Sequence, residues 1–497
     1  MTIPEGDRHE SRDLAQPRIA VDRGSAIADR VRGLTAPMLR IGSSLAGPVD
    51  AVQAPLAVDA VVVGLWLVGR LLGMPEAVAI AIVGAALIAM RWPATAVGLA
   101  TLVLLFPDSG RHVAGGLILV LAGGVGQLVW SRRQGHRLGV DAIVVAASLL
   151  MATTGLALFA TIGGAVSADA VRATIRWIGL MTGLLVLPIQ LFLVSRSAVR
   201  PTVILALGVT AALLLALVDH LVPTFVTQTP FAHFLSPALS DRATGPFDSP
   251  NRLGSVAAMT LVIALVAAVT RRKRLTRLVS LAIAAIAAVT LLLSFSRGAM
   301  LGAAVAIALL VALRSPRFGL TIAAILLAAG AVVGPFYVAA RLGFDTGTRS
   351  GQLAANDNER VAAWRAGIRM FASAPLTGHG YGSFQWIAAD AAGPMTLETA
   401  HNEVIGLLAE TGLPGAASFV AIFGIVVLRS LRPNPRGRIA LGVATTFVVA
   451  TMFNVQSIYP PVTVVLWTAI AYGLVAGPAP DRAGRARPTA SPLPTAR

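Results

Sequence analysis

The sequence predicts an all-α polytopic membrane protein with about fourteen transmembrane helices, or twelve if one pair of spans is miscounted. Three observations support this prediction. Hydrophobic residues make up 56% of the 497 residues and charged residues only 13%, against roughly 25% charged in a soluble domain. The apolar residues come in runs of about 17 to 25, the length of a bilayer-spanning helix. The 40 Lys and Arg, against 23 Asp and Glu, fall between these runs. A soluble globular protein is therefore excluded, and because the basic residues form no single stripe we expect no nucleic-acid binding.

The two ends of the chain differ from the rest in composition. Residues 1–54 carry seven Arg against seven Asp and Glu, with scattered Pro and Gly, and contain no apolar run long enough for the core of a signal peptide. We predict a partly disordered cytoplasmic tail here. Residues 477–497 are predicted to form a second disordered cytoplasmic tail.

The basic clusters fix the predicted orientation of the spans. If the chain starts in the cytoplasm and alternates sides, every cluster falls on the cytoplasmic side, where Lys and Arg are retained. The spans lie at about 56–73, 75–90, 94–106, 112–130, 139–163, 174–195, 201–219, 253–270, 278–294, 299–313, 318–339, 402–428, 439–457 and 461–476. The clusters are Arg132, Arg133 and Arg137; Arg196 and Arg200; Arg271, Arg272, Lys273, Arg274 and Arg277; Arg314 and Arg317; and Arg429, Arg432, Arg436 and Arg438.

Two long segments, 220–252 and 340–401, fall on the extracytoplasmic side in this topology. Polar, aromatic, Gly and Pro residues concentrate in them. Because function usually resides in such loops, we expect the activity of this protein on its outer face.

The first candidate motif is Ser294-Phe295-Ser296-Arg297-Gly298, at the outer end of one span and just before the next. An arginine inside hydrocarbon costs about 2.5 to 3.5 kcal/mol on insertion scales, so Arg297 should face headgroups or a polar cleft. One interpretation is an interfacial anchor that snorkels to the surface. The other is a phosphate ligand, since a guanidinium presents forked donors that match phosphate oxygens.

The second motif lies in the outer loop 340–401 and has the pattern of an amphipathic helix. Val361, Trp364, Ile368 and Phe371 recur at helical spacing, and Asp357 or Asn358 is suited to cap the helix. We predict that this helix lies on the outer membrane surface. Arg360 stands one turn before Trp364, whose ring could support the guanidinium. A functional role and a surface salt bridge are both compatible with Arg360.

The third motif is the glycine-rich segment 375–384, followed by His401, Asn402 and Glu403. Closely spaced glycines permit the backbone to approach a ligand. His401 and Asn402 begin the next membrane helix, and the partial positive charge of a helix N-terminus disfavours protonation of a nearby imidazole. A neutral His401 could accept a proton there, although a hydrogen-bonded interfacial histidine is the plainer interpretation.

Two further patterns flank these motifs. Gly412 and Pro414 interrupt the apolar run after Glu410, so residues 401–411 are expected to form a half-helix. Asn251 and Arg252 end the first outer loop, where they could bind a ligand or cap and anchor the next span.

The sequence offers no convincing metal or nucleotide site. It has no Cys, which excludes disulfides, thiol nucleophiles and Cys-ligated zinc, and it lacks His-Glu-x-x-His, Asp-x-Asp, Walker and dinucleotide motifs. We therefore expect no cofactor.

Taken in order, six short motifs resemble the O-antigen ligase and polymerase superfamily. They are Gly-x-Phe-x-x-Pro-Asn (245–251), Ser-Arg-Gly (296–298), Glu-Arg-x-x-x-Trp (359–364), Pro-Leu-Thr-Gly-x-Gly-x-Gly-x-Phe (375–384), His-Asn (401–402) and Glu-Thr-Gly (410–412). The resemblance covers about 245–428. It implies a GT-C-like membrane glycosyltransferase of the bacterial inner membrane, with its active site on the extracytoplasmic face. The basic clusters predict that both termini lie in the cytoplasm.

The resemblance also implies partners and residue roles. The expected donor is a glycan on undecaprenyl diphosphate, and the acceptor is a hydroxyl of a glycan, of lipid A–core or of a protein. The diphosphate-binding arginines of the family fall on Arg297 and Arg360, and its essential histidine falls on His401. We expect His401 to act as the base, with inversion at the anomeric carbon and no metal. Secondary candidates, from their proximity in sequence, are Arg252, Trp364, Tyr381, Asn402 and Glu403.

The predicted organisation follows from these assignments. It comprises the tail 1–54, N-terminal spans and first outer loop at 55–244, a catalytic region at 245–428, C-terminal spans at 429–476 and the tail 477–497. The main rival function is a secondary transporter or flippase for lipid-linked oligosaccharides, which would place ionisable pairs near the bilayer midplane. Most charges instead lie at the ends of the spans. The sequence predicts neither the identity of the acceptor nor an oligomeric state.

Overall fold

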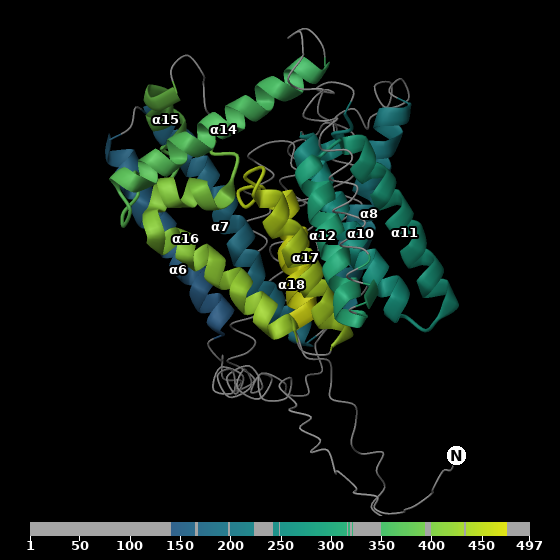
Figure 1. Cartoon of the computed structure of the whole chain (residues 1–497). Coiled ribbons are helices and arrows are strands. Elements are labelled where there is room, and N and C mark those ends of the chain that lie inside the picture. Colours follow the sequence, from purple (N-terminus) through teal and green to yellow (C-terminus); the bar gives the residue numbers. More distant parts are fainter. Residues whose placement is uncertain are drawn as a thin grey trace, which may run out of the picture. The chain divides into compact units, whose positions relative to one another are not determined.

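The computed structural model of the protein describes residues 141–164, 167–196, 199–222, 242–247, 249–315, 317–318, 321, 349–392, 399–431 and 434–474 (Figure 1). Every regular element in this part of the chain is helical. The helices are α6 (Ala142–Gly164), α7 (Ser167–Arg196), α8 (Val199–Leu221), the 3-10 turn η2 (Gly245–Phe247), α10 (Pro250–Thr270), α11 (Arg274–Ser294), α12 (Arg297–Arg314), α14 (Arg349–Ser373), α15 (Phe384–Ala392), α16 (Glu403–Ser430), α17 (Pro435–Thr451) and α18 (Pro460–Leu474).

The helices fall where the hydropathy pattern predicts spans. Within the described residues, α6, α10, α11, α12 and α16 are long and apolar enough to cross a membrane, and the apolar stretches Leu205–Leu221 and Pro460–Leu474 are shorter. A helix of 21 residues, such as α10, is about 31 Å long, which matches the hydrocarbon core. The described part of the chain is thus all-helical and has several helices that could span a membrane, as in a polytopic membrane protein. The tails, the first four predicted spans and nearly all of 318–339 lie outside the described residues, so the count of fourteen stays a prediction.

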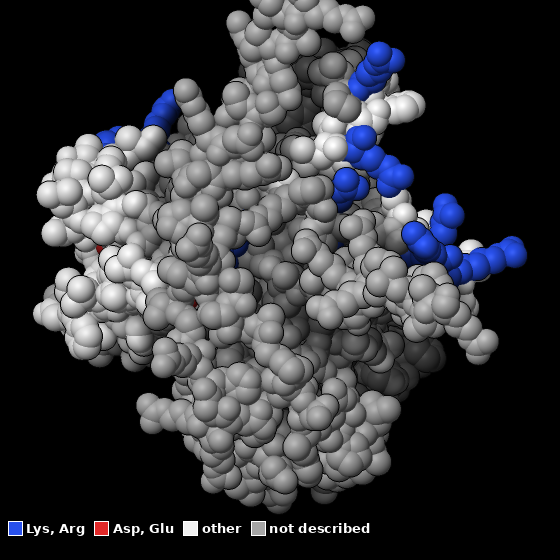
Figure 2. Space-filling model, turned by 90° about the horizontal axis from the view of Figure 1, so that it is seen from below, with Lys and Arg blue, Asp and Glu red and all other residues white. Residues whose placement is uncertain are grey.

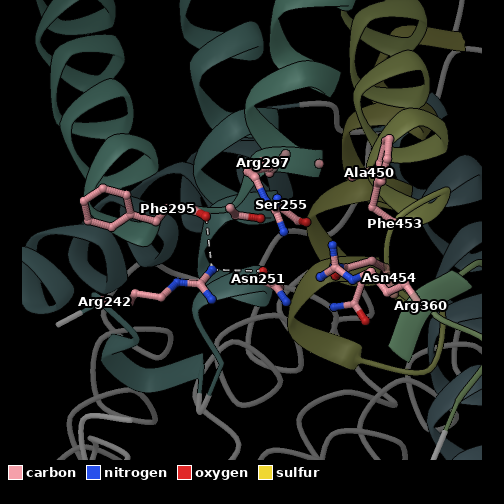
Figure 3. A pocket seen from close by; sticks show the side chains of 13 residues that line it. Arg242, Asn251, Ser255, Phe295, Arg297, Arg360, Ala450, Phe453 and Asn454 are labelled. Atoms are coloured by element: carbon pink, nitrogen blue, oxygen red, sulfur yellow. Dashed lines mark hydrogen bonds between the residues drawn. The ribbon is translucent and has the colours of Figure 1, made fainter. Parts of the chain in front are cut away.

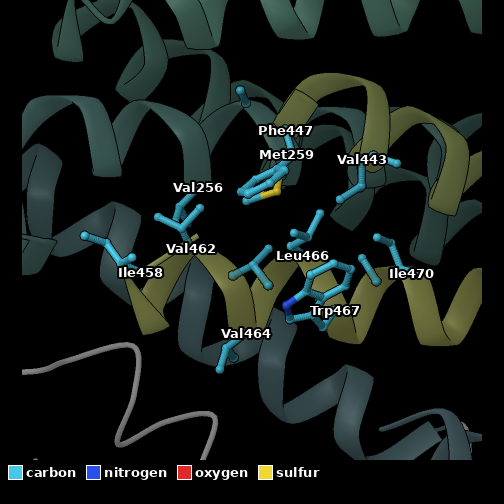
Figure 4. Packing of buried hydrophobic residues seen from close by; sticks show 14 of the residues in the cluster. Val256, Met259, Val443, Phe447, Ile458, Val462, Val464, Leu466, Trp467 and Ile470 are labelled. Atoms are coloured by element: carbon cyan, nitrogen blue, oxygen red, sulfur yellow. The ribbon is translucent and has the colours of Figure 1, made fainter. Parts of the chain in front are cut away.

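The core forms where α10, α17 and α18 meet. Met259 of α10, Phe447 of α17 and Trp467 of α18 are almost fully buried, and Figure 4 shows their side chains interleaved. The rings of Phe447 and Trp467 lie 5.5 and 5.7 Å from that of Phe423 on α16. This aromatic cluster ties α16 to the centre of the fold.

Small residues bring α12 close to α17. A Cβ on Gly302 would lie 2.5 Å from the carbonyl oxygen of Thr446, and one on Gly298 would lie 3.0 Å from Cβ of Phe453. Gly298, Gly302 and the buried Ala306 recur every four residues and so share one face of α12. Membrane helices commonly associate through such faces because lipid supplies no hydrophobic drive between them. The contact fixes the start of α12 beside the end of α17.

Basic residues among those that the structure describes gather at one end of the helices. Arg271, in the turn between α10 and α11, donates to the hydroxyl of Tyr472, and Arg436 lies 5.4 Å from the centre of the Tyr472 ring. At the same end Arg429 forms an ion pair of 2.8 Å with Asp141, whose other oxygen caps α6. Figure 2 shows Lys and Arg side chains at the edges of this face, most of them on the right, with little Asp or Glu among the residues drawn in colour. The candidate motifs lie at the opposite end.

Two predicted boundaries are wrong. The span expected at 439–457 stops at Thr451, and the polar residues that follow turn back toward the start of α16. The outer-loop helix begins at Arg349, so Asp357 and Asn358 lie inside α14 and do not cap it. Ala363, Ala366 and Met370 form the buried side of α14, whereas Val361 and Ile368 of the predicted apolar stripe are exposed. Small side chains on the buried side allow α14 to pack closely on α16. The predicted place of this helix on the membrane surface stays a prediction.

Candidate functional site

A cavity of about 310 Å³ lies at the end of the molecule where the motifs meet. The described residues that line it are Arg242, Asn251, Ser255, Phe295, Ser296, Arg297, Gly298, Ala299, Arg360, Ala450, Phe453, Asn454 and Gln456. They include three arginines and neither Asp nor Glu. In Figure 3 the guanidinium groups of Arg242, Arg297 and Arg360 point into the cavity from different elements. Such an arrangement suits a ligand with more than one negative charge.

Arg297 is placed by a tight turn between α11 and α12. Phe295 ends α11 in the left-handed conformation, with φ of 48°, and Arg297 is the first residue of α12. The turn packs on α10 at Gly254, where a Cβ would lie 2.8 Å from Oγ of Ser294. A left-handed non-glycine residue costs about 1–3 kcal/mol and commonly marks a functional site. The start of α12 also adds partial positive charge beside the guanidinium.

Arg242 completes the set of arginines and was not predicted. Its Nε donates to the carbonyl oxygen of Ser294 at 2.9 Å, and its Nη2 donates to the carbonyl oxygen of Phe295 and to Oδ1 of Asn251, at 3.3 and 3.1 Å. These bonds satisfy carbonyls that the end of α11 leaves without helical partners. Arg242 therefore holds the turn that positions Arg297 while it lines the cavity itself. Its place three residues before the motif at Gly245 is a signal that could have identified it.

Arg360 reaches the cavity because α14 packs on the first half of α16. A Cβ on Gly367 of α14 would lie 2.5 Å from Cγ2 of Ile405, and Ala363 and Ala366 are fully buried in the same interface. The absence of larger side chains on this face lets the two helices approach. Arg297 and Arg360, 63 positions apart, thus line one cavity. Their predicted role as diphosphate ligands stays a prediction.

The remaining wall comes from residues 450–456, which Asn402 and Glu403 hold in place. Nδ2 of Asn402 donates to the carbonyl oxygen of Met452 at 3.2 Å, and its Oδ1 caps α16 by accepting from the Ile405 amide. The buried carboxylate of Glu403 accepts from the amides of Gln456 and Ser457 and from the Ser457 hydroxyl. Neither residue lines the cavity, so both act on the site through the loop after α17.

Two polar atoms of the cavity wall are buried without a hydrogen-bond partner among the described residues. They are Oγ of Ser255 and Oε1 of Gln456. A buried polar atom left unpaired costs roughly 1–3 kcal/mol, so a ligand or water that pairs with either atom would be favoured.

His401 lies beside the cavity and is not among the residues that line it. Its Nε2 is 3.5 Å from Oε1 of Glu359, the residue before Arg360. Its backbone has φ of 49°, and Phe295 is the other non-glycine residue with positive φ in the described part of the chain. Both left-handed residues therefore adjoin predicted site residues. The imidazole is 24% exposed, so it remains accessible at the rim.

The other secondary candidates, Arg252, Trp364 and Tyr381, do not line the cavity. The guanidinium of Arg252 lies 3.4 Å from the centre of the Tyr459 ring and does not line the cavity, whereas its neighbour Asn251 does. The indole Nε1 of Trp364 is buried with no hydrogen-bond partner among the described residues. Tyr381 is buried, and its carbonyl accepts a hydrogen bond from Thr161 of α6.

The glycine-rich segment packs closely against other helices. Gly378, Gly380 and Gly382 all have positive φ, and a Cβ on any of them would clash, with α16, α6 and α7 respectively. The amide of Gly380 donates to the carbonyl oxygen of Glu410. These small residues let the loop pack closely onto the helices, and the ligand-approach interpretation stays a prediction.

A buried ion pair anchors the same segment. Oε1 of Glu410 accepts from the Phe384 amide at 3.2 Å and lies 3.4 Å from Nη1 of Arg176 on α7. Glu410 stands just before the kink at Gly412, where φ is 67° and ψ −165°. The predicted half-helix before Gly412 is thus confirmed.

The described residues contain no group of three or more His, Asp or Glu side chains arranged to hold a metal ion. The expectation of a reaction without metal or cofactor stays a prediction.

Comparison with known proteins agrees with the motifs. Residues 282–420 match the family model described as O-antigen ligase (Wzy_C). This region runs from α11 into α16 and contains Arg297, Arg360 and His401. No curated protein matches the sequence. Residues 282–420 of the chain are therefore similar to the O-antigen ligase family, in agreement with the order of the motifs.

Proposed function

We propose that the protein transfers a glycan from undecaprenyl diphosphate to an acceptor hydroxyl, on the extracytoplasmic face of the bacterial inner membrane. The acceptor oxygen attacks the anomeric carbon as the bond from that carbon to the diphosphate oxygen breaks. The electron pair of that bond stays on the diphosphate. A single displacement of this kind inverts the anomeric configuration.

The observation that carries the proposal is the meeting of Arg297 and Arg360 in one cavity, with Arg242 beside them. A lipid diphosphate gains negative charge as it leaves, and preorganised cations aimed at the developing charge lower the barrier. Guanidinium groups suit this role because their forked donors match phosphate oxygens. In this mechanism arginines supply the charge stabilisation that a divalent cation supplies in other glycosyltransferases.

We assign to His401 the role of the general base that accepts the proton of the acceptor hydroxyl. General-base catalysis requires a group within hydrogen-bond reach of that proton, and such geometry commonly tightens only when substrate is bound. His401 stands at the rim, where an acceptor would enter, and Glu359 is placed to orient its imidazole. A base oriented by a carboxylate is a recurring catalytic arrangement.

The buried ion pair between Arg176 and Glu410 is relevant to the alternative function, that of a transporter. A buried ion pair is what a transporter would place along its pathway. Here Glu410 also accepts from a loop amide, and its backbone carbonyl accepts from Gly380. The pair fastens the loop 378–384 to α7 and α16, which favours a structural role over an ion pathway.

The experiment is transfer by the purified protein, given undecaprenyl-diphosphate glycan and candidate acceptors, with and without a chelator. We expect formation of product and release of undecaprenyl diphosphate in both conditions. Arg297→Lys and Arg360→Lys should each lower transfer by about a hundredfold or more. Arg365→Lys is the matched control, because Arg365 is exposed on the same helix as Arg360 and does not line the cavity.

Several results would contradict the proposal. Loss of transfer on chelation would refute the metal-independent mechanism, and near-normal transfer by both lysine variants would refute the diphosphate site. Transport of intact lipid-linked glycan into the opposite leaflet, without any transfer, would support the transporter instead.

A further inference from the structure

A second cavity, of about 370 Å³, lies at the basic end of the molecule, opposite the candidate active site. It is a crevice between α10, α12 and α17, and most of its lining is aliphatic. The lining residues are Val262, Leu265, Val266, Val269, Thr270, Ile307, Leu310, Val311, Arg314, Ser315, Phe318 and Arg438. Nothing in the proposed transfer reaction uses this crevice.

One wall of the crevice comes from the larger side chains of α12. The small residues Gly298, Gly302 and Ala306 are followed toward the basic end by Ile307, Leu310 and Arg314. These three larger side chains line the crevice.

The crevice has an apolar rim that faces outward. Val269 is 61% exposed and Phe318 is 68% exposed, while Val262 at the inner end is fully buried. In a membrane-spanning bundle such a rim contacts acyl chains. An aliphatic slot of this size accepts a chain segment, because an empty slot forfeits dispersion contacts on its walls.

The end of the crevice nearest the basic end of the molecule, which we call its mouth, carries positive charge. Arg314 lies in the last turn of α12 and Arg438 in the first turn of α17, and both line the crevice. The carboxyl ends of α10 and α12 also lie here, but each contributes only about half a unit of negative charge. Two guanidinium groups exceed that contribution, so the mouth favours an anion.

We propose that this crevice binds one anionic phospholipid of the surrounding bilayer, with an acyl chain between α10, α12 and α17 and its phosphate between Arg314 and Arg438. Charge and shape both select this occupant: the aliphatic walls fit a chain, and two forked donors fit a phosphodiester that lacks a neighbouring ammonium group. The site is independent of the proposed transfer reaction.

The test measures lipid binding to the purified full-length protein in detergent by native mass spectrometry. The probes are phosphatidylglycerol and phosphatidylcholine with the same acyl chains, and dihexanoyl phosphatidylglycerol as a short-chain probe. We expect one phosphatidylglycerol to bind about tenfold more tightly than phosphatidylcholine, and the short-chain probe to bind weakly.

Variants then separate a site from general attraction to a basic surface. Arg314→Gln combined with Arg438→Gln should abolish the preference for phosphatidylglycerol. Arg274→Gln combined with Arg277→Gln removes the same charge from the same end, outside the crevice, and should preserve the preference. Arg314→Gln alone changes an exposed side chain and should weaken binding about fivefold.

Three outcomes would overturn the proposal. They are equal binding of the two headgroups, an equal loss of preference in both double variants, and undiminished binding of the short-chain probe. The first would remove the anion selectivity, the second would show diffuse attraction, and the third would leave the crevice without a role.

Discussion

Nε2 of His401 lies 3.5 Å from Oε1 of Glu359, and this contact joins the start of α16 to the helix that carries Arg360. The two residues are 42 positions apart, and neither side chain is fully buried. The contact places the imidazole next to the arginine cavity, although His401 does not line it. A shift of α14 would therefore move Arg360 and the partner of His401 together.

This relationship makes His401 and Glu359 a testable pair. His401→Ala should abolish transfer while leaving expression intact, because no other group is assigned to accept the proton. Glu359→Gln should lower the rate of transfer by about tenfold to a hundredfold, since the imidazole keeps its place but loses the carboxylate that orients it. The measurement is the initial rate of transfer with saturating donor.

His379→Ala is the control for these variants. The His379 ring contacts Ser373 and the Met370 carbonyl, away from the cavity. Its transfer rate should stay near normal. A rate near normal in His401→Ala would remove the histidine from the mechanism.

Arg242 should matter both for its charge and for the turn it holds. Arg242→Lys keeps the charge but cannot reproduce the forked bonds to Ser294, Phe295 and Asn251, so we expect transfer to fall by about tenfold or more. Arg242→Gln should reduce it further and raise KM for the donor. Arg172→Gln serves as the control, because Arg172 pairs with Asp169 on an exposed part of α7. If Arg242→Lys behaves like the unchanged protein, the forked bonds are not required.

The packing of α12 on α17 gives a prediction about stability. Gly302→Val would force a branched side chain against the Thr446 carbonyl and should destabilise the fold by about 1–3 kcal/mol. Gly424→Ala on α16 is the control, since a Cβ there meets nothing within 4 Å. It should be neutral or slightly stabilising. Thermal unfolding in detergent measures both variants, and equal midpoints would contradict the close contact.

The buried Tyr381 should make the free energy of unfolding depend on pH. Burial raises the pKa of the Tyr381 phenol above its ordinary value near 10, although Arg176 partly opposes the shift. Because the unfolded chain ionises first, the stability from this group is complete below pH about 10 and is lost as the pH rises above it. Tyr381→Phe should therefore lose less stability than the unchanged protein between about pH 9 and 11. Parallel unfolding curves for the two proteins would refute the buried neutral phenol.

The predicted topology can be tested directly because the chain has no cysteine. Single cysteines in place of Arg365 and Arg277 introduce reactive thiols at two exposed positions. In intact cells a membrane-impermeant maleimide should label the first and not the second. Labelling of both after lysis is the control, and the reverse pattern in intact cells would invert the topology.

The helices of the bundle were predictable because hydropathy is a local property of the chain. The spans that became α10, α11 and α16, and the kink at Gly412, follow from apolar runs and from Gly and Pro conformations alone. The order of the short motifs was likewise enough to indicate the family. The end of α17 could not be placed, because Thr451 stops the helix only where Asn402 and Glu403 bind the residues after it.

The sequence by itself therefore determined a basic, polytopic helical protein whose chemistry-bearing residues collect at one end of its spans. Tertiary structure alone decided which of those residues share a cavity. It placed Arg242, Asn454 and Gln456 in the wall of the cavity and Arg252 over the ring of Tyr459. It also brought the glycines of the segment 378–382 into close contact with other helices. The reason is physical: a side chain joins a site through the packing of helices distant in sequence, and one-dimensional spacing does not encode that packing.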